Sequence, residues 1–241
     1  MIEAAGIVVP AHDEETLLPS CLDALRQAVR SVSIPVHVLV AADSCTDGTV
    51  AVARAYGAEV ISIQARSVGA ARAAGMTEVL RLTADADPAA VWLATTDADT
   101  MVPPGWLRLQ LAQADQGWDV VLGTVSVTDW SEHPPQVPTA FAARYESGGR
   151  PHRHVHGANL GIRASAYRAA GGFMPLRTAE DQALVAAAAQ AGCSVLQAND
   201  ITVETSARRQ ARAPLGFSHL LRTLTAPAAP VDQCGAPAPP R

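Results

Sequence analysis

The feature that most constrains this chain is an apolar segment that ends abruptly in two carboxylates. The first half of Val91–Thr100 predicts a short buried strand, and Asp97 and Asp99 follow it at its carboxyl end. Open parallel sheets bind ligands at that edge, and two neighbouring acids repel each other unless a cation joins them. Mg²⁺ binds one or two carboxylates and completes its shell with water and phosphate oxygens, so the pattern predicts a metal–diphosphate site. An acidic turn that caps the next helix is the alternative interpretation of the same residues.

A second copy of the same tripeptide pattern serves as an internal control. Asp85 and Asp87 precede the expected strand instead of following it, and Pro88 comes next. A strand of this length separates the two copies by roughly 20–25 Å, at about 3.3 Å per residue. We therefore expect Asp85 and Asp87 to form a solvated turn at the opposite edge of the sheet.

Composition excludes several classes of protein. The formal net charge of −5 argues against a general nucleic-acid binder. The chain contains no lysine, which excludes a lysine nucleophile and a P-loop lysine. Its 241 residues suffice for one large α/β domain with its own core.

Cysteine spacing and hydropathy predict the compartment. The four cysteines show no paired spacing, so we interpret them as free thiols in a reducing environment. No run of 18 or more apolar residues predicts a transmembrane helix, and the first residues lack the pattern of a signal peptide. We therefore expect a cytoplasmic protein.

Strands and helices are expected to alternate along most of the chain. Apolar strand segments are followed by polar loops and then by helices, a pattern typical of a parallel sheet with right-handed crossovers. One helix opens near Leu18 with Pro19 in its first turn, and another opens at Thr178 with Asp181 at the fourth position of a capping box. The expected strands are 6–9, 36–41, 59–63, 91–95, 120–125, 155–163, 194–196 and 202–203.

Two further segments have open interpretations. Residues 130–154 predict an irregular cover loop with a short helix around 141–145. His152, His154 and His156 alternate, so an extended strand would place them on one face, either as a metal cluster or as a loop edge with one ring near substrate. Arg208, Arg209 and Arg212 precede an apolar segment that is interpreted as a phosphate-contacting lid, a membrane-surface helix or a terminal helix with a solvated face.

Short motifs follow the expected strands in order along the chain: Val8 to Glu14, Asp43 to Thr49, Gly69 to Arg72, Asp97 to Asp99, Gly157 to Asn159 with Gly171 to Phe173, and Glu180-Asp181. This ordered set resembles the family 2 glycosyltransferases, which have the GT-A fold. The likeness covers roughly residues 5–212. It implies one α/β domain over 1–212, with a Rossmann-like, mostly parallel sheet and helices on both faces. Residues 1–100 would form the nucleotide-sugar half and 101–212 the acceptor half. Residues 213–241 would form a C-terminal helix or lid and a disordered Pro/Ala-rich tail.

The resemblance implies a role for each matching residue. Asp181 would be the catalytic base, and Asp97 and Asp99 would hold Mg²⁺ or Mn²⁺. The nucleotide would contact Pro10, His12, Glu14, Asp43, Gly69, Arg72 and Asp97. The acceptor would contact His156, Gly157, Ala158, Asn159 and Glu180.

The sequence departs from the family pattern at three places. Asp13 stands where Asn is common, and Ala42 replaces an acid often found beside Asp43. No distal histidine that could serve as an extra metal ligand is evident near Thr205.

The expected reaction is transfer of a sugar from a nucleotide sugar, a UDP- or GDP-sugar in first place, to a hydroxyl acceptor with inversion. A nucleotidyltransferase on a related sheet is a rival, although it would usually have a Gly-rich first loop with a basic residue. A nucleotide-sugar-binding protein without catalysis is the second rival, against which the acids at 99 and 181 argue. Peripheral contact with a membrane remains open.

Overall fold

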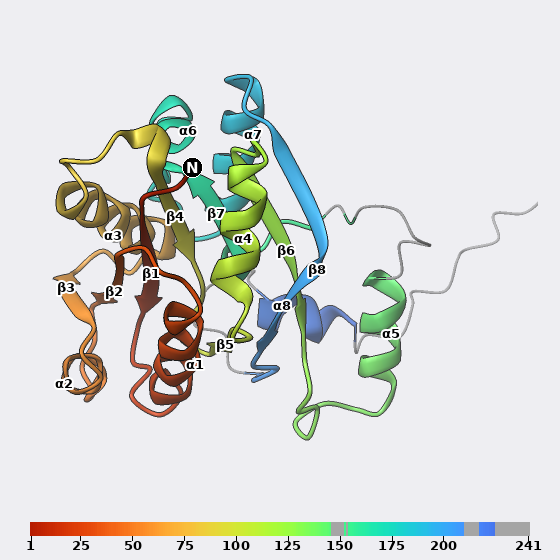
Figure 1. Cartoon of the computed structure of the whole chain (residues 1–241). Helices are drawn as coiled ribbons and strands as arrows, with labels where there is room; N and C mark the ends of the chain where they lie inside the picture. The colour runs from red at the N-terminus through yellow and green to blue at the C-terminus, as the bar shows by residue number, and fades with distance from the viewer. Residues whose placement is uncertain (146–151, 153, 210–216, 225–241) are drawn as a thin grey trace, which may run out of the picture.

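The computed structural model describes residues 1–145, 152, 154–209 and 217–224. They form an eight-stranded sheet in the order β3-β2-β1-β4-β7-β6-β8-β5 with helices packed on both faces (Figure 1). The strands are β1 (Ala4–Ala11), β2 (Val36–Asp43), β3 (Glu59–Ile63), β4 (Val91–Thr95), β5 (Thr100–Met101), β6 (Val120–Ser126), β7 (Leu160–Arg163) and β8 (Val195–Thr205). The α-helices are α1 (Leu18–Arg30), α2 (Thr49–Ala55), α3 (Val68–Leu82), α4 (Trp106–Asp115), α5 (Gln136–Tyr145), α6 (Ala164–Ala169), α7 (Glu180–Gln190) and α8 (Phe217–Thr223).

The first four long strands form the parallel part of the sheet. β1 pairs in parallel with β2 and β4, and β2 pairs in parallel with β3. The carboxyl ends of β1, β2 and β4 therefore lie at one edge, as the sequence predicts. β7 runs antiparallel between β4 and β6, and β8 returns parallel to β6. The expectation of a mostly parallel α/β sheet with helices on both faces is confirmed.

Each face of the sheet buries a separate apolar cluster. On one face α1 and α4 contribute Leu18, Leu25 and Trp106, and on the other α3 and α7 contribute Met76 and Leu184. A buried leucine side chain contributes about 1.5–3 kcal/mol relative to an exposed one. The two clusters thus hold both helical layers on the strands that carry the site.

Glycines set the distance between α3 and β1. A Cβ at Gly75 would lie 2.4 Å from a methyl group of Val8, and a Cβ at Gly6 would lie 2.1 Å from a methyl group of Val79. No larger side chain fits at either position without moving the helix. The two glycines therefore let α3 pack closely on β1.

The structure corrects several element boundaries. Residues 157–159 form a short 3₁₀ turn (η2, Gly157–Asn159), so only the second half of the expected strand 155–163 is strand. The two short late strands are one strand, β8, with a register irregularity opposite Leu122 and Thr124 of β6. The helix expected at 141–145 begins earlier, at Gln136.

The prediction for 213–241 falls mostly outside the described residues, apart from α8. Within the described ranges no helix is both long and apolar enough to cross a bilayer.

Candidate active site

Carboxylates from three strand ends gather at the carboxyl edge of the sheet. Asp97 and Asp99 follow β4, Glu14 follows β1, and Asp43 is the last residue of β2. The other Asp-x-Asp copy lies at the amino end of β4, where exposed Asp87 accepts a hydrogen bond from the amide of Ala89 at 2.8 Å. The expectation of a solvated turn at 85–87 is confirmed, and only the later copy faces the ligand edge.

Arg72 of α3 is the centre of a buried charge network. Its guanidinium donates to Asp97 Oδ1 at 2.5 Å and to the carboxylate of Glu180, and its Nε donates to Thr95 Oγ1 at 3.3 Å. The Arg72 side chain is only 4% exposed and that of Glu180 only 5%. Burial opposes its charge, but the neighbouring acids, Asp97 first, raise the pKa of Arg72 above its usual value. Arg72 therefore tethers the loop after β4 to the start of α7, a different arrangement from the nucleotide contact predicted for it.

Arg208 is the positively charged partner of Asp99. Its two terminal nitrogens donate to the carboxylate of Glu14 at 2.7 and 2.6 Å, and one of them lies 3.0 Å from Asp99 Oδ2. Burial raises the pKa of Asp99 to about 7, although the charge of Arg208 opposes that rise. From the sequence we expected a metal ion to offset the repulsion between Asp97 and Asp99. In the structure two arginines, Arg72 and Arg208, offset it. The sequence analysis offered Arg208 as part of a phosphate-contacting lid but did not predict its pairing with Glu14 and Asp99, because nothing local marks these distant partners.

The acids after β4 have the chemistry of a divalent-metal site, since carboxylate oxygens suit Mg²⁺ and Mn²⁺. Among the described residues, five carboxylates lie around two guanidinium groups at this site, so the charge balance also favours a cation: Glu14, Asp97, Asp99, Glu180 and Asp181 against Arg72 and Arg208. Asp97 is the more accessible of the two candidate ligands, with 37% of its side chain exposed against 13% for Asp99. The residues therefore fit a divalent ion, provided that Arg208 yields its place at Asp99.

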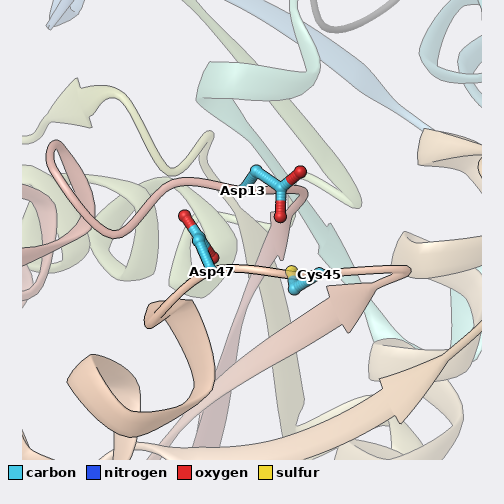
Figure 2. Close-up of side chains that lie close together, drawn as sticks. All are labelled: Asp13, Cys45 and Asp47. Atoms are coloured by element: carbon cyan, nitrogen blue, oxygen red, sulfur yellow. The ribbon is translucent and has the colours of Figure 1, made fainter.

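A different group of potential ligands converges nearby. Among the described residues, Asp13, Cys45 and Asp47 are the three whose ligand atoms lie within 4.8 Å of one another (Figure 2). Asp13 already accepts from the amide of Thr46 at 2.7 Å, and Asp47 accepts from the amide of Thr49 at 3.0 Å. These backbone contacts explain the cluster as a joint between the loops after β1 and β2.

Asp43 organises the loop that leads into α3. Its two carboxylate oxygens accept from the amides of Ala65, Arg66 and Ser67 at 2.7, 2.9 and 2.7 Å. Burial opposes ionisation, but these amides outweigh it and lower the pKa of Asp43. The amides before α3 thus bind the protein's own carboxylate, and His12 flanks this loop by donating from Nδ1 to the Asp43 carbonyl oxygen at 2.7 Å.

Replacing Asp43 with Asn should destabilise the fold by about 1–3 kcal/mol at pH 7, because an amide NH₂ would then face a backbone N–H. The folded pKa of Asp43 lies below the ordinary value of 3.8, so its contribution is present above that value and is lost as pH falls through the folded pKa. Urea unfolding of wild type and Asp43→Asn from pH 7 to pH 3 should therefore show a gap between their free energies of unfolding that narrows as the pH falls. A gap that stays constant or widens would contradict the role given to this carboxylate.

The start of α3 also holds the loop that precedes α7. The amide of Gly69 and the hydroxyl of Ser67 both donate to the carbonyl oxygen of Leu176, at 3.0 and 2.8 Å. A Cβ at Gly69 would lie 2.2 Å from the carbonyl oxygen of Met174, so this contact requires glycine. Gly69 thus allows the backbone near Leu176 to approach α3 closely. The start of α3 therefore supports both the loop held by Asp43 and the loop that precedes α7.

Asp181 lies in the first turn of α7, partly exposed, and faces the turn before β7. Its Oδ2 accepts from the amide of Gly157 at 2.8 Å and its Oδ1 from the amide of Gln182 at 2.8 Å. The capping box expected from Thr178 is wrong, because the residue before the helix is Ala179, in left-handed conformation at φ 59°, with no side-chain cap. The carboxylate of Asp181 thus binds the amides of Gly157 and Gln182 instead of forming a capping box with Thr178.

The residues predicted to meet the acceptor divide into two groups. Gly157 borders Arg72, whose guanidinium carbon would lie 2.4 Å from a Cβ at this position. Asn159 is fully buried, accepts from the Trp106 indole at 2.8 Å, and donates to the carbonyl oxygens of Thr124 and Ile201. Its amide is therefore saturated and holds the wall of the site together, and the adjacent Ala158 is buried as well. An acceptor contact by Asn159 is not favoured by this arrangement, and Glu180 is paired with Arg72, whereas His156 remains partly accessible.

The three histidines form a stack instead of a metal cluster. Successive ring centroids of His152, His154 and His156 lie 6.0 and 5.7 Å apart, with nearly parallel planes. His152 Nε2 donates to the Leu122 carbonyl oxygen, and its Nδ1 accepts from the amide of His154. Burial and the two neighbouring rings lower the pKa of His156 to about 4, so it is neutral at pH 7. The loop-edge alternative is the one that the described residues support.

With this geometry established, comparison with known proteins identifies the family. Residues 6–171 match the family described as glycosyl transferase family 2, and the chain belongs to that family. A fragment of TarS from S. aureus in complex with UDP-GlcNAc is 17% identical, with a TM-score of 0.64 over 87% of this chain and 60% of that one. The mannosyltransferase PcManGT from Pyrobaculum calidifontis, in complex with GDP-Man and Mn²⁺, is 16% identical, with a TM-score of 0.62 over 91% and 60%.

A third similar structure is glucosyl-3-phosphoglycerate synthase from Mycobacterium tuberculosis in complex with Mg²⁺ and UDP. It is 19% identical, with a TM-score of 0.54 over 92% of this chain and 78% of that one. At these identities the likeness shows a shared GT-A fold. The chain spans about 60% of the length of the TarS fragment.

Proposed function

We propose that this chain transfers a sugar from a nucleoside diphosphate sugar, a UDP- or GDP-sugar in first place, to a hydroxyl acceptor with inversion. The observation that carries the proposal is the Arg72 tether. It joins Asp97, on the donor side, to the first turn of α7, where Asp181 faces the acceptor side. A reaction between two substrates needs both sides held in one geometry, which lowers the entropic cost of bringing the reactants together.

The donor would lie across the strand ends. The loop after β1, with Pro10, His12 and Glu14, and the Asp43 loop would frame the base and ribose. A divalent ion held by Asp97 and Asp99 would neutralise negative charge on the leaving diphosphate. The complexes of similar structures with UDP-GlcNAc, GDP-Man and UDP support a donor of this class.

The proposed chemistry is a single displacement. The acceptor oxygen attacks the anomeric carbon as the bond from that carbon to the diphosphate oxygen breaks, and the electron pair leaves with the diphosphate. The carboxylate of Asp181 takes the proton from the attacking hydroxyl. The two hydrogen bonds from Gly157 and Gln182 would hold that carboxylate in place. Attack from the face opposite the leaving group inverts the anomeric centre.

Calorimetric titration with UDP, GDP, CDP and dTDP, each with and without Mn²⁺, tests the donor site. One nucleotide should bind in a metal-dependent way, and Asp99→Ala should weaken it by at least about tenfold. Asp85→Ala provides the matched control, because it removes an acid from the other Asp-x-Asp copy, and should leave affinity unchanged. If the folded protein binds none of the four, the proposal fails.

A turnover assay with the donor identified by calorimetry addresses the non-catalytic alternative. A protein that binds a nucleotide sugar but releases no nucleoside diphosphate with any of a broad set of hydroxyl acceptors would be a binding protein. Turnover with one acceptor, abolished by an Asp181 substitution, would identify a transferase.

A further inference from the structure

Arg208 comes from the far end of the chain but lies in the middle of the acid cluster. It is 194 residues away from Glu14 in sequence, yet it forms a two-pronged hydrogen-bond pair with that side chain. The Glu14 side chain is 5% exposed, that of Asp99 is 13% exposed and that of Arg208 is 20% exposed. A buried carboxylate of this kind needs a positive partner to remain ionised.

The backbone around Arg208 fixes it at this place. Strand β5 follows Asp99 at once and pairs with the end of β8, with Thr100 opposite Thr205. The amide of Ser206 donates to the carbonyl oxygen of Asp99 at 3.2 Å, and the amide of Arg208 donates to Ser206 Oγ at 3.2 Å. The arginine is therefore delivered beside Asp99 by secondary structure.

A divalent ion and this guanidinium would compete for the same ligand. Arg208 lies 3.0 Å from Asp99 Oδ2, so an ion coordinated by that oxygen would come into close contact with the guanidinium. Two cations so close together repel each other strongly in a partly buried site. A cavity of about 210 Å³ borders Asp99 and Arg208 and gives the guanidinium space to withdraw, with Cys21, Thr128, Glu132 and Ser206 among its lining residues.

We propose that Arg208 is an internal cation that occupies the Asp99 site and sets its affinity for divalent metal, so that arginine and metal exclude each other there. The inference rests on the proposed function, because a metal at Asp99 is part of that proposal. The test measures binding of Mn²⁺ without nucleotide. The role proposed for Arg208 and the proposed donor site can therefore fail independently of each other.

The experiment measures Mn²⁺ affinity of the full chain without nucleotide, by electron paramagnetic resonance of the free ion. Arg208→Gln should bind Mn²⁺ at least about tenfold more tightly than wild type. Arg208→Lys, which keeps the charge but loses the planar fork, should fall between the two. Arg209→Gln is the matched control: it removes the same charge one residue away, where the backbone amide contacts Glu132, and should change affinity less than about twofold.

Adding Asp99→Asn to Arg208→Gln should abolish the gained affinity, which locates the ion. Unchanged or weaker Mn²⁺ binding in Arg208→Gln would overturn the inference, as would equal gains in Arg208→Gln and Arg209→Gln. Absence of Mn²⁺ binding in every variant would overturn it too, because Asp99 relieved of its arginine would then not be a cation site. Thermal unfolding confirms that each variant is folded, and Arg208→Lys serves as the test variant if Arg208→Gln is not.

Discussion

Asp181→Asn is expected to lower kcat by about 10²–10⁴, the usual contribution of a positioned general base, while the affinity for the donor nucleotide stays near that of wild type. Asn has the same size as Asp but does not accept a proton from the attacking hydroxyl. The contacts of Asp181 lie with Gly157 and Gln182, away from the residues assigned to the base and ribose. Binding and turnover should therefore separate in this variant.

The measurement needs the nucleotide found by calorimetry and an acceptor found by screening. Asp200→Asn, an exposed acid of β8, is the control, and it should leave kcat and donor affinity unchanged. A kcat for Asp181→Asn within about threefold of wild type would remove Asp181 as the base, since loss of a general base costs far more.

Arg72→Ala should destabilise the protein by about 3–5 kcal/mol, a large part of the 5–15 kcal/mol that stabilises a typical domain. Truncation leaves Glu180 buried without its arginine and releases Asp97. Arg72→Lys should recover only part of the loss, because one ammonium group does not reproduce the planar fork that reaches both acids. Denaturant unfolding measures each change.

Two comparisons separate this charge network from general effects of substitution. Arg81→Ala on the same helix removes an exposed partner of Glu78 and should change stability little. The double variant Arg72→Met with Glu180→Met should be more stable than Arg72→Ala, because it removes the unpaired charge as well as its partner. If Arg72→Ala and Arg81→Ala had equal effects, the buried network would not be a main source of stability.

The fold could be predicted from the sequence because its signals are local. Apolar strands followed by polar loops identified the strand ends, and the two Asp-x-Asp copies were correctly assigned to opposite ends of β4. The site was only partly predictable, because its ion pairs join distant residues. Arg72 is 108 residues from Glu180, and Arg208 is 194 from Glu14. No window along the chain reveals such pairs.

The capping box is a case in which a local sequence signal was present but tertiary contacts overruled it. Thr178 and Asp181 have the right spacing, but the preceding loop docks through Leu176 on the start of α3. Ala179 adopts a left-handed conformation there, a strained state for a residue with a Cβ, and α7 begins only at Glu180. Packing against another helix thus outweighed the cap.

The close packing of α3 on β1 affects the thermodynamics of ligand binding. With Gly6 and Gly75 in contact with valine side chains of the other element, α3 has no room to slide. Its first turns hold the Asp43 loop and the Leu176 loop, so both are ordered before a ligand arrives. A nucleotide that binds there loses little affinity to the ordering of protein groups. Affinity at this edge should then depend mainly on the contacts themselves, and calorimetry should find a small conformational entropy penalty.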